Sequence, residues 1–180
     1  NVSQAFGQLL QFSDKIDEQI YKREDTVNYL DKVISEYIST ALATPNLNVN
    51  ISQALSSYYL MLVDIERISD YAVNMNHQAT KRLQGDMTIS EIEIVEHMKK
   101  LCVDMKNDLS DVEEAERKDD VIDSLVSSWR EAQIQALKQQ KCSSEVSMML
   151  SRIFTDFERI NDHALNVSQE FDKINIEIPE

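Results

Sequence analysis

Residues 64–74 read DIERISDYAVN, and the pattern returns at residues 156–166 as DFERINDHALN. Seven of the eleven positions are identical, and the two copies are 92 residues apart (156 minus 64). The identical pairs are Asp64/Asp156, Glu66/Glu158, Arg67/Arg159, Ile68/Ile160, Asp70/Asp162, Ala72/Ala164 and Asn74/Asn166. A hydrophobic core requires recurrent apolar residues but not recurrent carboxylates. The chain is therefore predicted to contain two copies of one helical unit, each with the same acidic stripe.

The composition favours long helices and a cation-binding surface. Only two Gly and two Pro occur in 180 residues, so few positions suit tight turns. The formal net charge of −14 disfavours nucleic acid, whose phosphates need basic partners, and also anionic lipid. No apolar run approaches the roughly 20 residues that a membrane span needs. The sequence predicts one all-α domain of 1–180.

Apolar periodicity predicts helices over about 3–43, 50–83, 90–110, 113–140 and 144–173. The first carries one apolar stripe, formed by Val27, Leu30, Ile34, Ile38 and Ala41. The two motif helices carry heptad seams. These seams are Met61, Ile65, Ile68, Ala72, Met75 and Ala79, and then Ile153, Phe157, Ile160, Ala164, Val167 and Phe171.

Helix ends are predicted from capping residues. Asn50 with Gln53, and Ser90 with Glu93, have capping-box spacing, and Gly85 is expected to end the helix before it. Repeat one then covers about 1–84, repeat two about 90–173, and 174–180 form a tail. Each repeat is expected to be a three-helix bundle.

The acidic residues of each copy are candidate metal ligands. Residues four apart lie one above the other on a helix, so each motif presents a glutamate and an aspartate on one face. A weaker alignment of the preceding helices, at an offset of 95, adds two residues to each set. The sets are Glu24, Asn28, Glu66 and Asp70, and Asp119, Asp123, Glu158 and Asp162. Such oxygen ligands suit hard cations: iron, manganese, magnesium or calcium.

A second interpretation of these stripes stays open. Any single E-x-x-x-D is most simply a solvated acidic face. Arg67 lies three residues from Asp64 and Asp70, and Arg159 has the same spacing, so surface ion pairs could account for the aspartates. No nucleophile with a spaced base and no phosphate-binding Gly-rich loop is present, which argues against an enzyme.

The E-R-x-x-D-x-A-x-N string, present twice, resembles the PhoU family over nearly the whole chain. The resemblance implies two three-helix bundles, metal clusters bound by the acidic motifs, and regulation of phosphate uptake. It implies metal ligands at the eight positions given above, except that Asn28 stands where an aspartate is expected. Arg67, Asn74, Arg159 and Asn166 would be supporting motif residues.

The second copy of the motif and the residues before it resemble one branch of this family in particular. The stretch KCSSEVSMMLSRIFTDFERINDHALN is similar to the cytosolic PhoU-like tail of bacterial sodium-dependent phosphate cotransporters. We therefore expect a cytoplasmic regulatory domain attached to a membrane-embedded phosphate transporter, with a second copy of the chain as another candidate partner. The alternatives are a stand-alone PhoU-type regulator of phosphate ABC transport and signalling, and a metal-free helical adaptor.

Overall fold

The computed structural model describes residues 1–80, 87–107 and 109–177. All regular structure within these ranges is helical, which confirms the predicted all-α class. The helices are α1 (Val2–Leu10), α2 (Asp14–Leu42), α3 (Val49–Thr80), α4 (Ile89–Asn107), α5 (Val112–Lys138) and α6 (Ser144–Glu177). None of the helices in these ranges is long and apolar enough to cross a membrane.

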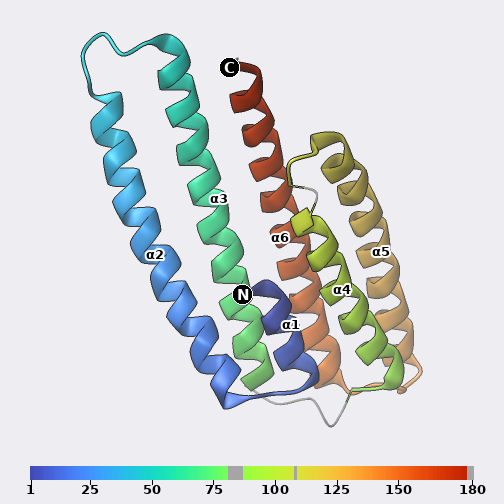
Figure 1. The fold of residues 1–180 in the computed structure, drawn as a ribbon. Helices are drawn as coiled ribbons and strands as arrows, with labels where there is room; N and C mark the ends of the chain where they lie inside the picture. Colours follow the sequence, from blue (N-terminus) through green and yellow to red (C-terminus); the bar gives the residue numbers. More distant parts are fainter. Residues whose placement is uncertain (81–86, 108, 178–180) are drawn as a thin grey trace.

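The helices form two related three-helix units, α1–α3 and α4–α6. In each unit the two long helices pair, α2 with α3 and α5 with α6. The units are joined mainly along the two motif helices, because the contact of α3 with α6 is the broadest among the helices described above. Figure 1 shows the α2–α3 hairpin on one side, α5 on the other and α6 between them, with α1 and α4 next to each other.

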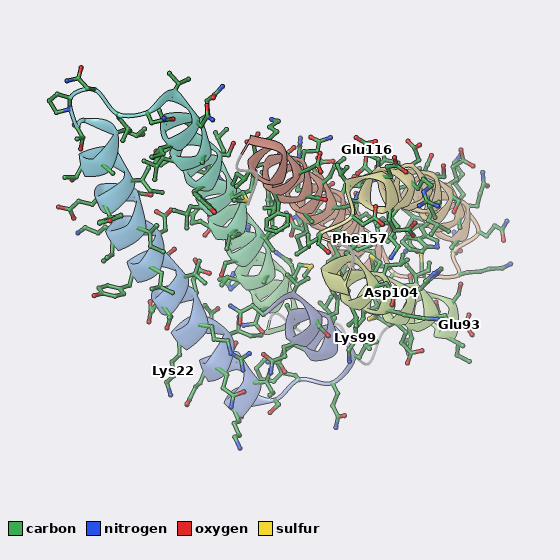
Figure 2. All side chains as sticks on the ribbon, turned by 45° about the horizontal axis from the view of Figure 1, so that its top comes forward. Lys22, Glu93, Lys99, Asp104, Glu116 and Phe157 are labelled. Atoms are coloured by element: carbon green, nitrogen blue, oxygen red, sulfur yellow. The ribbon has the colours of Figure 1, made fainter. Side chains whose placement is uncertain are left out.

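One apolar core spans both units. Phe6 of α1 meets Phe157 of α6 edge to face, with ring centroids 5.9 Å apart, and Trp129 of α5 packs on Phe154 and Phe157. Figure 2 shows Phe157 inside the bundle, whereas Lys22 lies on the outer side of α2. Since all six helices contribute buried apolar side chains to this cluster, the two repeats are packed as one body.

The predicted first helix is divided in two. The buried Gln8 side chain donates to the Ser13 carbonyl at 3.0 Å and accepts from the Ser13 amide at 2.7 Å. These bonds satisfy the backbone of a turn at 11–13, where α1 ends and α2 begins. The prediction of one helix over 3–43 was therefore wrong. It was made because the apolar periodicity of the sequence continues through this turn.

Two predicted helix starts are also displaced. The side chain of Asn48 caps α3 by accepting from the Asn50 amide at 2.8 Å. Thr88 and Glu91 form the capping interaction of α4, with the Thr88 amide 2.7 Å from a Glu91 carboxylate oxygen. Both true caps lie two residues before the predicted ones. The predicted end at Gly85 lies outside the described residues, and α6 continues to Glu177 rather than ending near 173.

The apolar stripe of α2 is only partly covered. Leu30 and Ile34 are 47% and 37% exposed, although the sequence pattern places them on an inward face. The first helix of repeat one has nine residues, against nineteen in its counterpart α4. The half of the α2–α3 hairpin that is nearer its connecting loop therefore extends beyond α1, as Figure 1 shows.

Candidate functional site

The first aspartate of the repeated motif lies at the contact between the two repeats. A carboxylate oxygen of Asp64 on α3 lies 2.7 Å from Nδ1 of His163 on α6, and it accepts from Asn166 Nδ2 at 3.3 Å. The Tyr71 and His163 rings stack with centroids 5.8 Å apart. Asn166 therefore contacts the other repeat.

The second copy of this aspartate is also at the α3–α6 contact. Asp156 and Asn74 both line an open hollow of about 350 Å³ between the two helices. Burial raises the pKa of Asp156 to about 6 from 3.8, and Arg152 offsets part of this effect. The two equivalent aspartates thus have different surroundings.

Glu66 and Asp70, at the third and seventh motif positions, face α2 of their own repeat. Together with Glu24 they form the first acidic patch. Ser69 donates a hydrogen bond to the buried Glu24 carboxylate. Burial raises the pKa of Glu24, and the nearby Asp70 raises it further. Burial followed by the charge of Asp70 also raises the pKa of Glu66. The first acidic patch therefore holds its carboxylates close enough to repel one another.

The second repeat reproduces this arrangement. Asn161, at the motif position of Ser69, donates to Asp119, at the aligned position of Glu24. The two equivalent hydrogen bonds support the weaker alignment between the preceding helices. Burial raises the pKa of Asp119, followed by the charges of Asp123 and Asp162. Asp119, Asp123 and Asp162 form the second acidic patch, on the opposite hairpin.

Two residues that the sequence prediction missed make the patches different. Asp31, one turn beyond Asn28 on α2, adds to the charge that raises the pKa of Glu66. Its spacing of seven from Glu24 was a signal in the sequence. Arg130 of α5 forms an ion pair with Glu158 at 2.6 Å, and no sequence pattern connects these two residues.

The predicted ligand Asn28 does face the patch. Its side chain hydrogen-bonds the Glu24 carboxylate and lowers the pKa of that group, in opposition to burial and Asp70. An amide oxygen is a neutral ligand, so Asn28 adds no charge here, whereas the neighbouring Asp31 does.

Comparison with known proteins agrees with the duplicated architecture. The family description "PhoU domain" matches residues 2–79 and 89–171, one segment for each repeat. The chain belongs to the PhoU domain family. A Thermotoga maritima protein named "Phosphate-specific transport system accessory protein PhoU homolog 1" is 22% identical, over 94% of this chain and 77% of that protein.

The PhoU fold is also found among solved structures. The crystal structure of PhoU from Pseudomonas aeruginosa superposes with a TM-score of 0.84 at 19% identity, over 96% of this chain and 87% of that chain. A likeness at this level of identity shows the fold. It agrees with the two-bundle architecture predicted from the sequence.

The motif arginines of this PhoU domain lie on its surface. Arg67 Nε is 3.8 Å from Glu66, and Arg159 Nη1 is 3.4 Å from Asp162. Both arginine side chains are more than half exposed, at 56% and 59%. Exposed pairs of this kind stabilise a fold by roughly 0–1 kcal/mol, so they neutralise the patches only weakly.

The donor chemistry of both patches fits a hard cation, and the side chains would have to turn toward it. Among the described residues, no three acidic, histidine or cysteine side chains are arranged to hold one metal ion without adjustment. The carboxylates nevertheless stand on paired helices, and those of Glu24, Glu66 and Asp119 bind protons more readily than usual. A cation would relieve the repulsion that contributes to these raised pKa values.

Proposed function

We propose that this chain is a PhoU-type regulator of phosphate uptake that acts in the cytoplasm and binds hard cations on its acidic patches. The observation that carries the proposal is the duplicated motif together with its geometry. In each repeat, motif residues and an acidic residue of the preceding helix are joined by an equivalent hydrogen bond, Ser69 to Glu24 and Asn161 to Asp119. Iron, manganese, magnesium and calcium all suit such carboxylate ligands.

The named relatives favour a regulator of a phosphate-specific transport system. The Thermotoga protein is called an accessory protein of such a system, and the matching structure is of a PhoU protein. Attachment to a sodium-dependent phosphate cotransporter is the finer form of the proposal, and it rests on the similarity of residues 141–166 to that branch. Co-purification of the tagged chain from its own cells, followed by mass spectrometry, separates the two forms by the transporter recovered.

The metal part of the proposal is tested by metal content and by thermal melts. Protein purified without chelator is examined by elemental mass spectrometry, and melted with Mn²⁺ or with chelator. A cation present at about 100 times its dissociation constant stabilises the fold by about 2.7 kcal/mol. For a domain of this size that is a shift of about 5–10 °C in Tm. Identical melts, with no metal retained after reconstitution, would favour the metal-free adaptor.

A matched pair of variants shows where the cation binds. Glu66→Gln with Asp70→Asn removes two charges from the first acidic patch and should reduce the Mn²⁺ shift. Glu93→Gln with Glu131→Gln removes two charges from exposed positions outside both patches and should leave the shift unchanged. Equal losses from the two pairs would mean that Mn²⁺ responds only to net charge.

Phosphate uptake by cells tests the regulatory role. Cells lacking the gene should take up phosphate without normal control, and the wild-type chain should restore control. The Glu66→Gln, Asp70→Asn chain should fail to restore it at equal abundance, whereas the Glu93→Gln, Glu131→Gln chain should succeed. Full restoration by both would separate phosphate control from the first acidic patch.

A further inference from the structure

We infer that Arg130 is a built-in cation of the second repeat, which pairs with the predicted ligand Glu158 and leaves the first acidic patch as the stronger site for a metal ion. The inference rests on the proposed cation binding and concerns how the two repeats share it. It assigns a role to a residue outside the repeated motif.

Arg130 is held in place by several contacts. Its guanidinium Nη2 donates to Glu158 Oε2 at 2.6 Å and to Thr155 Oγ1 at 3.1 Å. Its Nη1 donates to the Ser151 carbonyl at 3.3 Å, and the group lies over the Phe154 ring, 5.7 Å from the centroid. These partners follow one face of α6. A guanidinium with this many contacts is positioned more firmly than an ordinary surface arginine.

The pairing gives Glu158 a cationic partner on the neighbouring helix of its own repeat. The same Arg130 nitrogen that contacts Glu158 also donates to Thr155 of α6. In the first repeat, by contrast, the arginine beside Glu66 is Arg67 of the same helix, at 3.8 Å and 56% exposed. The same motif glutamate therefore has a more distant, exposed arginine of its own helix in repeat one, and a close arginine of the neighbouring helix in repeat two.

The aligned residues of α2 explain the difference. At the offset of 95 that relates the two preceding helices, Arg130 corresponds to Ser35, and Val126 corresponds to Asp31. Repeat one thus has a small hydroxyl where repeat two has a cation. It also has an additional carboxylate where repeat two has a buried valine. Both substitutions make the first acidic patch more negative, which compensates for the neutral Asn28.

The expected size of the effect follows from Coulomb repulsion. A divalent ion about 6 Å from a guanidinium in water-like surroundings loses about tenfold in affinity. Loss of Glu158 as a ligand adds to this difference. The first acidic patch should therefore bind a divalent cation at least about tenfold more tightly than the second.

The test is calorimetric titration of metal-free protein with Mn²⁺, in a background that isolates the second patch. Glu66→Gln with Asp70→Asn disables the first acidic patch, and Arg130→Gln is then added. Arg130→Lys keeps the positive charge, and Arg152→Gln removes an arginine that lines the hollow on the other side of α6. Circular dichroism confirms that each variant keeps its helices.

In the disabled background, Arg130→Gln should strengthen Mn²⁺ binding about tenfold, whereas Arg130→Lys and Arg152→Gln should change it less than twofold. Further replacement of Asp162 by Asn should abolish the gain. If the wild-type chain binds Mn²⁺ but Arg130→Gln leaves binding unchanged in a folded variant, the role of Arg130 is overturned and the proposed metal function is not. Failure of the wild-type chain and every variant to bind Mn²⁺ would overturn the proposed metal function together with this inference.

Discussion

Asp156 is an ionised group whose neutralisation should stabilise the protein. The carboxyl is half-buried at the contact between the repeats, and burial raises its pKa to about 6 from 3.8. A raised carboxyl pKa means that the folded state prefers the protonated form. The stabilisation by protonated Asp156 is fully present below about 3.8 and is lost as the pH rises through about 6. At pH 7.5 the folded protein carries the whole cost of the buried charge.

The magnitude follows from the two pKa values. A change from 3.8 to about 6 corresponds to an upper limit of about 3 kcal/mol. Solvent reaches part of the group, so the expected cost is about half of that, or 1–2 kcal/mol. Asp156→Asn removes the charge and retains the shape. It should raise the free energy of unfolding at pH 7.5 by about 1–2 kcal/mol, which corresponds to about 3–6 °C in Tm.

Urea unfolding of both proteins between pH 4 and pH 8 measures this difference. The advantage of Asp156→Asn should be small at pH 4, grow between pH 4 and pH 6, and remain constant above pH 7. Asp64→Asn is the matched control, because Asp64 has the same motif position but lies 2.7 Å from His163. That control should destabilise the protein. A variant of Asp156 that is less stable than the wild type at pH 7.5 would refute the reasoning.

Three other substitutions test contacts that the structure shows, each by urea unfolding at pH 7.5. Ser69→Ala removes the donor to the buried Glu24 carboxylate and should cost about 1–3 kcal/mol; a change below 0.5 kcal/mol would show that Glu24 finds another partner. Phe157→Ala opens a cavity in the shared core and should cost about 3–5 kcal/mol, with a single cooperative transition if the repeats unfold together. His163→Phe keeps a ring beside Tyr71 but leaves Asp64 without its histidine, and should cost about 1–2 kcal/mol; unchanged stability would mean that this inter-repeat pair contributes nothing.

Helix prediction succeeded where local physics decides and failed where a distant contact does. The 144–173 helix follows its apolar seam, and Ile153, Phe157 and Ile160 are buried as expected. The break between α1 and α2 was not predicted, because the turn at 11–13 depends on the hydrogen bonds of a buried Gln8 side chain. Glutamine is compatible with a helix interior, so its role there cannot be recognised locally.

Core prediction from periodicity has a similar limit. A stripe in the sequence shows which face of a helix is apolar, but it does not show that another helix covers it. The residues from Val27 to Ala41 follow a regular stripe, yet Leu30 and Ile34 are substantially exposed, whereas Ile38 on the same stripe is buried. The packing partner at each position, and not the stripe itself, decides which of its residues are buried.

The sequence by itself determined the duplication, the all-helical class, the family and the carboxylates on each helix face. The duplication and the family follow from the repeated motif. The carboxylate faces follow from spacing within one helix, where 3.6 residues per turn fixes which side chains lie together. Only the tertiary structure decided which charges meet between helices. Glu158 pairs with Arg130 and Asp64 with His163 because two helices pack in one register, and a shift of one turn would exchange every partner. The same motif residues therefore have different partners in the two repeats.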